Sequence, residues 1–261
     1  MAVLEATGSL VGKPSLLSIV TVCFNPGSIV LDAIRSVQAQ DYPAIEHVVI
    51  DGGSTDGSLD LITSALRPGD TLVSEQDHGM YDAMNKGIAL ASGSVIALLN
   101  ADDQYANPAV ARRFMEVLAS SGSDCVLGDV AFFAGEPTNI VRRYNSGRFS
   151  PRRVRWGMMP AHPAMVVRKE AYERIGPYRT DYQIAADFEW VVRAFVHSGL
   201  NYTYVPEIFV LMALGGVSTR GLSARRLINR ETVRACLENG IYTNRAMISA
   251  KYIFKVLELL E

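Results

Sequence analysis

An apolar run from Val95 to Leu99, which ends in a cluster of polar residues, constrains this chain most. Five apolar residues in succession have the length and composition of a fully buried strand. Asn100, Asp102 and Asp103 follow it closely, and open α/β sheets bind ligands outside the carboxyl ends of their strands. Adjacent carboxylates repel each other and are costly to desolvate, so they usually meet a cation or a donor-rich ligand. The stretch predicts either a divalent metal site with oxygen ligands or a solvated turn before a helix that starts near Asn107.

Strand and helix patterns alternate through the first hundred residues. Runs rich in β-branched and apolar residues predict strands over 17–23, 45–50, 71–74 and 94–99. Apolar residues at helical spacing predict helices over about 28–40, 58–66 and 80–91. Short loops between these elements favour consecutive βαβ units. We therefore expect an α/β fold with a single, Rossmann-like, mostly parallel central sheet flanked by helices.

The composition is that of a soluble globular protein with a substantial core. The chain has 261 residues, of which 49% are hydrophobic and 20% charged. No apolar run reaches the roughly 18 residues of a membrane span, and no secretory leader pattern opens the chain. Its three cysteines are widely spaced, which fits neither a disulfide framework nor a zinc site. We expect a cytoplasmic protein and no nucleic acid partner.

Charge is divided unevenly between the two halves of the chain. Residues 1–141 carry 6 Lys and Arg against 17 Asp and Glu, a balance of -11. Residues 142–261 carry 19 against 10, a balance of +9. An acidic half suits a metal, and a basic half suits phosphates or an anionic membrane. The alternative is that the two halves neutralise each other across their interface.

Three common phosphate chemistries lack their motifs. No Gly-x-Gly-x-x-Gly follows the first predicted strand, and no Gly-x4-Gly-Lys-Ser/Thr occurs anywhere. The loop over 25–28 carries no cation, whereas a sugar nucleotidyltransferase would need a basic, glycine-rich loop there. These absences disfavour a standard dinucleotide fold, a P-loop enzyme and a nucleotidyltransferase.

Polar residues also follow the first two predicted strands. Asp51 can accept an N–H from a base, and Phe24 or Tyr81 can stack on it. The glycines at 52 and 53 allow a ligand to approach the backbone closely. The alternative for Asp51 is a turn or cap residue.

Several motifs in order resemble the signatures of family 2 glycosyltransferases. They are Ser18-Ile-Val-Thr-Val-Cys-Phe-Asn25, Val49-Ile-Asp-Gly-Gly-Ser-Thr-Asp-Gly57, Gly79-Met-Tyr-Asp-Ala-Met-Asn-Lys-Gly87, Leu99-Asn-Ala-Asp-Asp103, Trp156-Gly-Met-Met-Pro-Ala-His-Pro-Ala-Met165, Ile184-Ala-Ala-Asp-Phe-Glu-Trp190 and Leu214-Gly-Gly-Val-Ser218. The resemblance covers roughly residues 16–220 and includes a subgroup that builds bacterial exopolysaccharides and cell-surface glycans. It implies inverting enzymes of the GT-A fold that use a nucleotide sugar and usually Mg²⁺ or Mn²⁺.

The resemblance assigns donor-binding positions. Thr21 and Val22 match positions that touch the nucleoside, and Asp51 matches the carboxylate that pairs with the base. The resemblance implies that the donor is a UDP-sugar, the usual donor in the family. Asn100 and Asp102 match the first and last positions of the family's Asp-x-Asp motif, which makes Asp102 the metal ligand. The Asn departs from the motif, so only one carboxylate is expected to bind the metal directly. The remaining donor-binding positions are Phe24, Asn25, Gly53, Tyr81, Asp82, Lys86 and Ala101.

Two features near these positions differ from the family or have a second interpretation. Met84 stands where many members place an Arg near the donor. Lys86 either supplies the missing positive charge or is a solvated helix lysine.

Asp187 matches the family's catalytic aspartate, the general base that an inverting displacement requires. Many members carry an acid directly before it, where this chain has Ala186. Glu189 should point elsewhere on a helix. The alternative for Asp187 is an N-cap role for the helix that carries Trp190.

The acceptor side is less sharply defined. Arg155 belongs to an arginine-rich segment, 142–155, that either binds phosphates or forms a solvated basic face. His162 and Trp190 fall on the acceptor side by resemblance, although a structurally satisfied histidine is the alternative for His162. Residues 214–219 are predicted to form a loop that closes over the donor.

The resemblance also implies a domain plan. Residues 1–15 would be flexible, and 16–220 would form the catalytic domain. Its nucleotide-sugar-binding half would span 16–104 and its acceptor-binding half 105–220, with a helical extension over 221–261. We expect that extension to lie on the inner face of a membrane, to form a homodimer, or to pack on the catalytic domain.

The leading hypothesis is a metal-dependent inverting glycosyltransferase that acts on a glycan or lipid-linked acceptor hydroxyl, with Asp187 as base. The alternative is a catalytically impaired sugar-nucleotide-binding protein, supported by Ala186 and Asn100. A sugar nucleotidyltransferase comes third.

Overall fold

The N-terminal half of the structure is a parallel sheet with helices on both faces. The computed structural model describes residues 14–214 and 221–250. The strands of this half are β1 (Leu17–Cys23), β2 (Ile45–Asp51), β3 (Thr71–Ser74) and β4 (Val95–Asn100). The helices are α1 (Val30–Gln38), α2 (Ser58–Ala65) and α3 (Met80–Leu90), with a short 3₁₀ turn η1 (Gly27–Ile29) before α1. All seven strands and helices expected here are present, with ends that shift by one or two residues.

The C-terminal half adds strands of both directions. They are β5 (Asp103–Tyr105), β6 (Cys125–Phe133), β7 (Ile140–Tyr144), β8 (Met165–Arg168) and β9 (Tyr202–Ala213). The helices are α4 (Val110–Ser121), α5 (Lys169–Ile175), α6 (Ala186–Val192) and α7 (Gly221–Glu238). Short helical turns connect them: η2 (Ser146–Arg148), η3 (Pro151–Trp156), η4 (His162–Ala164) and η5 (Arg193–His197).

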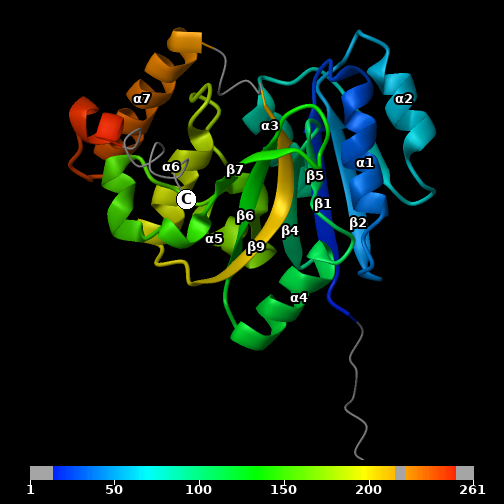
Figure 1. The fold of residues 1–261 in the computed structure, drawn as a ribbon, viewed down its shortest axis with the longest axis horizontal. Coiled ribbons are helices and arrows are strands. Elements are labelled where there is room, and N and C mark those ends of the chain that lie inside the picture. The colour runs from blue at the N-terminus through cyan, green and yellow to red at the C-terminus, as the bar shows by residue number, and fades with distance from the viewer. Residues whose placement is uncertain (1–13, 215–220, 251–261) are drawn as a thin grey trace, which may run out of the picture.

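Among the described residues, these strands form one nine-stranded sheet. Its order is β3-β2-β1-β4-β8-β6-β9-β5, and β7 pairs with β6 outside that path. Strands β3, β2, β1 and β4 are parallel, β8 runs antiparallel to both its neighbours, and β6 and β9 are again parallel. The expected α/β sheet is confirmed, with its parallel part concentrated in the N-terminal half (Figure 1).

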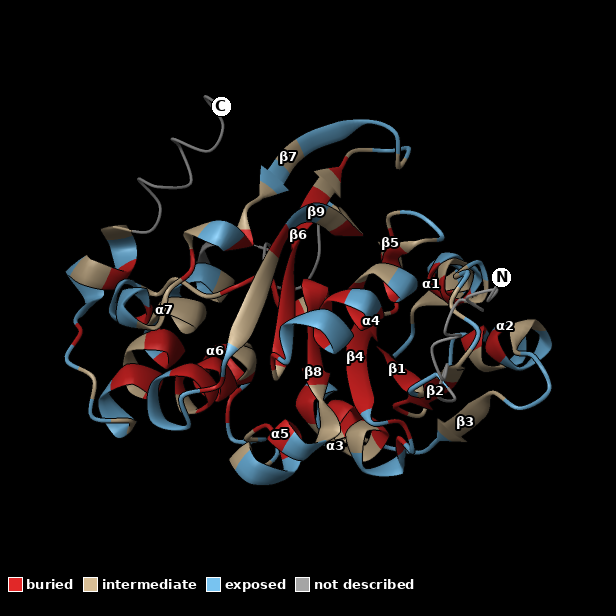
Figure 2. Cartoon of the chain, turned by 90° about the horizontal axis from the view of Figure 1, so that it is seen from below, coloured by how far each residue is buried: buried red, intermediate tan, exposed pale blue. Residues whose placement is uncertain are grey.

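Both faces of the central strands are covered, which explains why their sequences are continuously apolar. Every residue of β1 is buried. On one face, α1 places Val30, Ala33, Ile34 and Val37 at helical spacing against the sheet. On the other face, α3 packs so closely that a Cβ at Gly87 would lie 2.2 Å from Cγ1 of Val20. Figure 2 shows burial concentrated along the central strands, whereas β7 is mostly exposed.

The C-terminal helix α7 packs on the domain. Ala235 and Cys236 lie in the same buried cluster as Trp190 and Val191 of α6. Helices α6 and α7 lie together on the side of the sheet away from α1 and α2 (Figure 1). Helix α7 therefore packs on the described part of the domain, and the membrane and homodimer contacts expected of the C-terminal extension stay predictions. No helix in the described ranges is long and apolar enough to cross a membrane.

Two helix boundaries follow from the local backbone. Helix α7 ends at Glu238, and Gly240 then adopts a positive φ of 68°, which stops the helix. The helix expected near Asn107 starts at Val110 instead, because Asp103 begins strand β5. Most of 1–15, the closing loop over 214–219 and the last turns after 250 lie outside the described residues.

Candidate active site

The polar ends of three parallel strands meet at one edge of the sheet. The register of β1 with β2 places Cys23 beside Asp51, and that of β1 with β4 places Val22 beside Asn100. The backbone N–H of Ala101 then donates to the carbonyl of Val22 at 3.2 Å. Residues that lie far apart in the sequence therefore share one edge, as expected for carboxyl ends of parallel strands.

Asn25 joins the loop after β1 to the loop after β2. It adopts φ 47°, which is uncommon for a residue other than glycine. Its backbone N–H donates to Oγ of Ser54, and its Oδ1 accepts from the N–H of Thr55, both at 2.8 Å. Phe24, directly before it, is 66% exposed and lies next to Gly52. This leaves one exposed aromatic ring at the strand-end edge, held by a fixed loop.

Asp51 is fully buried and has several hydrogen-bond donors of its own. Its carboxylate accepts from the N–H of Ser54 at 3.0 Å, from Oγ of Ser54, and from Oγ of Ser74 at 2.6 Å. Burial alone would raise the pKa of Asp51, but these hydrogen bonds outweigh it and leave the pKa below its ordinary value. Asp51 is therefore an ionised acceptor at the edge. Gly53 follows it with φ 81°, close to the backbone of Gln76.

The side chains of Thr21 and Val22 point into the protein. The Thr21 hydroxyl lies 3.0 Å from Nε2 of His47, fully buried, and Val22 belongs to the core. The expectation that these two positions touch the nucleoside stays a prediction, and because both residues are buried, their backbone would have to make the contact. Both side chains pack inside the protein and support the end of strand β1.

The acidic segment after β4 mixes exposed and buried groups. Asp102 is exposed, whereas Asp103 is buried and accepts a 2.9 Å hydrogen bond from Nδ2 of Asn100. Burial, then the charge of Asp102, raises the pKa of Asp103 well above its ordinary value. Among the described residues, Oδ1 of Asn100 and Oδ1 of Asp103 are buried without a hydrogen-bond partner. The alternative of a simple solvated turn does not fit this burial.

These oxygen atoms fit a hard divalent cation, with few protein ligands. Asp102 offers an exposed carboxylate, and Asn100 offers a buried amide oxygen that lacks a partner. No group of three or more His, Cys, Asp or Glu side chains that could hold a metal occurs in the described residues. Mg²⁺ usually keeps waters and shares one or two carboxylates with a substrate phosphate, which suits such a sparse set.

Lys86 is neither solvated nor a free positive charge. Its Nζ lies 2.8 Å from Glu75, in hydrogen-bond contact with Asp77, and 3.7 Å from Asp82. The hydrogen bonds that Lys86 donates to Asp77 and Glu75 raise its pKa. Asp82 also accepts the N–H of His78 at 3.0 Å. Lys86 and Asp82 thus hold the loop that leads from β3 into α3, beside the strand-end edge.

Asp187 lies in the first turn of α6 and is partly exposed. One carboxylate oxygen accepts the N–H of Phe188 at 2.8 Å and lies 3.3 Å from the phenol oxygen of Tyr81. Burial raises the pKa of Asp187, and the nearby His162 opposes that shift most. Ala185, not Asp187, is the N-cap residue, so the capping alternative is wrong. Glu189 is buried and bonded to Arg193, as expected for a residue that points elsewhere.

Tyr81 does not stack on a base, contrary to one expectation. Its side chain is only 3% exposed, and its hydroxyl donates to the carbonyl of Ile184 at 2.5 Å. Burial and the charge of Asp187 raise its pKa well above the ordinary value, which keeps it a hydrogen-bond donor. Sequence reasoning missed this contact because Tyr81 and Asp187 are 106 residues apart.

Two of the three acceptor-side residues are buried. His162 is buried and its Nε2 lies 2.9 Å from the hydroxyl of Tyr178, so the satisfied-histidine alternative describes its present contacts. Burial lowers its pKa, which keeps it neutral near pH 7. Trp190 is 0% exposed, donates its indole N–H to Gly176 at 3.0 Å and packs against the ring of Tyr172. Placing Trp190 in contact with an acceptor was wrong, because its whole ring lies in the core.

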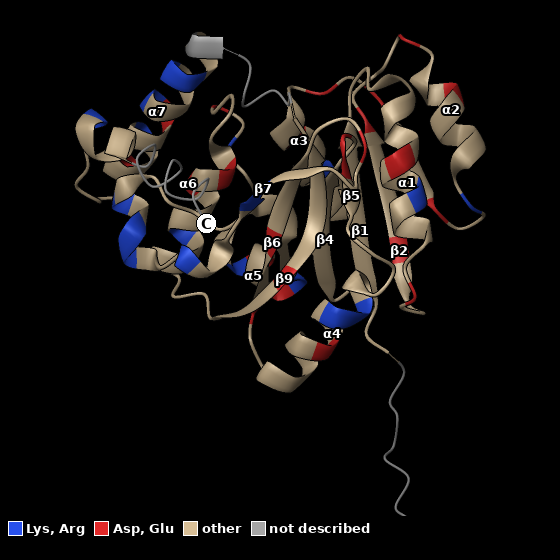
Figure 3. Ribbon diagram, viewed as in Figure 1, with Lys and Arg blue, Asp and Glu red and all other residues tan. Residues whose placement is uncertain are grey.

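The arginine-rich segment divides into two parts. Arg143 is bound to the buried carboxylate of Asp129 at 2.6 Å, and is therefore structural. On η3 three arginines are exposed beside Trp156, which is 38% exposed; they are Arg152, Arg153 and Arg155. Figure 3 shows Lys and Arg gathered around η3, α5 and α7, on the side away from β2 and the loops that carry many of the acidic residues.

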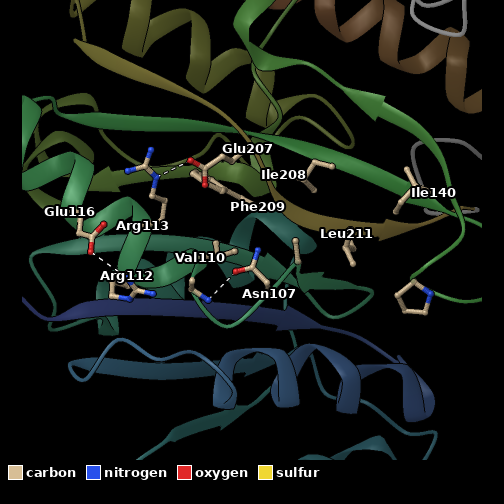
Figure 4. Close-up of a pocket in the computed structure, with 13 residues that line it drawn as sticks. Asn107, Val110, Arg112, Arg113, Glu116, Ile140, Glu207, Ile208, Phe209 and Leu211 are labelled. Atoms are coloured by element: carbon tan, nitrogen blue, oxygen red, sulfur yellow. Dashed lines mark hydrogen bonds and ion pairs between the residues drawn. The ribbon is translucent and has the colours of Figure 1, made fainter. Parts of the chain in front are cut away.

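A separate surface pocket of about 520 Å³ lies between α4 and β9. Figure 4 shows the ion pair between Arg113 and Glu207, 2.9 Å long, at this pocket. Its walls combine Val110, Ile140 and Phe209 with these charged groups, and none of the expected site residues lines it. The pocket does not belong to the strand-end edge.

Comparison with known proteins agrees with this geometry. The family model described as glycosyl transferase family 2 matches residues 18–176. A PGL/p-HBAD biosynthesis glycosyltransferase of Mycobacterium bovis is 32% identical over 198 residues, which cover 73% of this chain and 73% of that protein.

Solved structures share the fold at low identity. The mannosyltransferase PcManGT from Pyrobaculum calidifontis, in complex with GDP-Man and Mn²⁺, has a TM-score of 0.66 at 18% identity, over 92% of this chain and 69% of that one. S. aureus TarS has a TM-score of 0.60 at 17% identity; the match covers 91% of this chain but only 43% of TarS. A shorter TarS, 1–349, is known in complex with UDP-GlcNAc.

The mixed α/β sheet is that of the GT-A fold, which these solved structures share. The family match and the mycobacterial relative show that the chain belongs to glycosyl transferase family 2. It is therefore a transferase enzyme.

Proposed function

We propose that this enzyme is a metal-dependent, inverting glycosyltransferase that moves a sugar from a UDP-sugar to a hydroxyl of a glycan or lipid-linked acceptor in bacterial surface polysaccharide synthesis. The setting of Asp187 carries the proposal. It is a partly exposed carboxylate with a raised pKa, held by the N–H of Phe188 and placed beside Tyr81. A general base works best when its pKa approaches the operating pH, and burial shifts Asp187 in that direction.

Asp187 acts as the base of a single displacement in this proposal. The acceptor oxygen bonds to the anomeric carbon while its proton passes to a carboxylate oxygen of Asp187. The bond from that carbon to the diphosphate oxygen breaks, and its electron pair leaves on the nucleoside diphosphate. Because attack comes from the face opposite the leaving group, the anomeric configuration inverts. Phe188 and Tyr81 orient the carboxylate for this transfer.

The donor side uses the strand-end edge. The exposed ring of Phe24 offers a plane for the base, and ionised Asp51 offers an acceptor for an N–H of uracil. Asp102 and Asn100 would hold Mn²⁺ or Mg²⁺ together with the diphosphate. When bound, the cation supplies charge stabilisation for the departing diphosphate. PcManGT, which shares the fold and is known in complex with GDP-Man and Mn²⁺, supports a nucleotide-sugar donor and a divalent metal.

Contacts connect the donor edge to Asp187 through α3. Phe24 packs beside Gly52, which lies close to the carboxylate of Asp77. Asp77 binds Lys86 of α3, and the first turn of the same helix carries Tyr81, which meets Asp187. One rigid helix therefore links the two parts of the proposed site.

The acceptor is proposed to approach from the basic side of the molecule. Arg152, Arg153 and Arg155 are exposed on η3 beside Trp156, a combination that suits an anionic or lipid-linked acceptor at the inner face of a membrane. The mycobacterial relative is named for PGL/p-HBAD biosynthesis, which supports a surface-glycan role.

Two measurements test the proposal. A thermal-shift panel of UDP-, dTDP- and GDP-sugars with Mn²⁺ should raise Tm most with one nucleotide sugar. That donor should then release nucleoside diphosphate only when both Mn²⁺ and an acceptor are present. Release of pyrophosphate instead would indicate a nucleotidyltransferase, and binding without release would indicate a sugar-nucleotide-binding protein.

A further inference from the structure

Glu231 of helix α7 holds the segment that leads directly into Asp187. Its carboxylate is only 4% exposed and accepts three consecutive backbone N–H groups. They come from Gln183 at 2.9 Å, Ile184 at 2.9 Å and Ala185 at 3.0 Å. Charge-assisted hydrogen bonds of this kind are among the stronger ones in proteins. A single side chain thus satisfies the amides of the whole turn before α6.

The same turn is held from its other side by α3. The hydroxyl of Tyr81 donates to the carbonyl of Ile184 at 2.5 Å, while Glu231 accepts the N–H of that residue. Ile184 is therefore fixed by a donor from α3 and an acceptor from α7. Asp187 follows three residues later and shares Tyr81 as a contact. The position of the Asp187 carboxylate depends on both helices.

Helix α7 is itself anchored to the chain just before this turn. Arg234 binds Asp181 and Glu238, and Arg179 binds Glu238 at 2.7 Å. The hydroxyl of Tyr182 donates to Glu238 at 2.9 Å. This network is exposed and lies nearly two turns of α7 beyond Glu231. It fixes the helix without touching the amides of 183–185.

We propose that Glu231 is a positioning residue for Asp187, so that α7 is a working part of the active site. This inference rests on the proposed function, in which Asp187 is the base. The matched part of the family model ends at residue 176, so both carboxylates lie beyond it. Displacing a reacting group by about 1 Å can cost roughly 10²-fold in rate, even when the mutated residue is remote from the chemistry.

The test compares Glu231→Gln with Glu238→Gln, both in the full chain. Glutamine keeps the size of Glu231 but has a single acceptor oxygen, and it brings an NH₂ group toward backbone donors. For Glu231→Gln we expect kcat to fall about 10- to 100-fold while donor KM changes less than about twofold. Glu238→Gln should keep kcat within about twofold, although it also removes a carboxylate from α7.

Hydrogen exchange gives a readout that does not require activity. The amides of 184 and 185 should exchange slowly in the wild type and in Glu238→Gln, and much faster in Glu231→Gln. Unchanged kcat in Glu231→Gln, or a fall in donor affinity that matches the fall in kcat/KM, would overturn the proposal. If Glu231→Gln does not fold, fast exchange of the two amides in the wild type would overturn it, and slow exchange would support it.

Failure of this inference is distinguishable from failure of the proposed function. An inactive wild-type enzyme with every donor and acceptor would reject the function. An active wild type with an equally active Glu231→Gln variant would reject only the role of Glu231.

Discussion

The phenol oxygen of Tyr81 lies 3.3 Å from a carboxylate oxygen of Asp187 and 2.5 Å from the carbonyl oxygen of Ile184. Tyr81 comes from α3 in the N-terminal half, whereas Asp187 and Ile184 lie in and just before α6 in the C-terminal half. A single hydroxyl therefore contacts both the proposed base and the turn that positions it. Tyr81 therefore connects the two halves of the proposed site by direct contact.

Replacing Tyr81 by Phe should leave the base in place but less well oriented. The variant loses a hydrogen bond to Asp187 and leaves the carbonyl of Ile184 without its donor, which should cost about 1–3 kcal/mol of folding free energy. We expect kcat to fall about 3- to 10-fold, measured as nucleoside diphosphate release. Tyr172→Phe is the matched control, since it truncates a buried tyrosine whose hydroxyl meets Tyr178 instead. Equal losses of kcat in the two variants would refute a specific role for Tyr81.

In the profile of kcat against pH, the acid limb should lie above the ordinary pKa range of an aspartate. Burial raises the pKa of Asp187, and the base works only when ionised, so activity should fall as pH decreases through that raised value. His162, the backbone N–H of Phe188 and the hydroxyl of Tyr81 oppose this increase in pKa. Because the Tyr81 hydrogen bond lowers the pKa, Tyr81→Phe should move the limb to higher pH. An acid limb at or below about pH 4 in the wild type would contradict this assignment.

Phe24→Ala should weaken donor binding with little effect on chemistry. The ring is exposed at the edge, and stacking of an aromatic pair contributes about 0.5–1.5 kcal/mol. The expected result is a 2- to 10-fold increase in donor KM with kcat nearly unchanged, because the ring binds ground state and transition state alike. Phe24→Tyr retains the ring and should behave like the wild type. A lower kcat at unchanged KM would place Phe24 elsewhere in the mechanism.

Asp102→Asn should abolish the response of the enzyme to metal. In the wild type, Mn²⁺ together with UDP should raise Tm, because ligands that bind only the folded state stabilise it. Without the exposed carboxylate of Asp102, we expect most of that increase to disappear. Asp60→Asn removes an exposed carboxylate on α2, far along the chain from this segment, and should keep the full increase. If Asp102→Asn retains it as well, the metal binds at another position.

The sequence was informative where local pattern decides structure. The continuous apolar runs of β1 and β4 predicted buried parallel strands, and their register then brought Asp51 and Asn100 to one edge. The sequence alone therefore predicted which polar residues follow which strand. Asp103, in contrast, was expected only as a neighbour of the metal ligand, and its burial comes from strand β5, which is too short to recognise by pattern.

Two errors had signals that were overlooked. Tyr81 stands three residues before Met84 and seven before Ile88, the spacing of one buried helix face, which argued against an exposed stacking ring. Trp190 is followed by two valines within a short, largely apolar helix, a pattern typical of complete burial. In both cases family position was given more weight than periodicity.

Other contacts had no local signal. Glu231 reaches the turn before α6 across 46 to 48 residues, and only the packing of α7 on α6 brings it there. Lys86 was expected to be either a donor contact or a solvated lysine, whereas two acids from the loop after β3 and one from α3 converge on it. Tertiary packing decides such pairings, and the local pattern of a single sequence does not predict them.

The most direct measurement compares nucleoside diphosphate release by the wild type and by Asp187→Asn, with the donor from the thermal-shift panel, Mn²⁺, and alkyl or aryl glycosides as acceptors. Asparagine has nearly the same shape but cannot accept the acceptor proton, so release should fall at least about 10³-fold. Donor binding, followed by the increase in Tm, should remain within about twofold of the wild type. Full release by Asp187→Asn would contradict the assignment of Asp187 as the base.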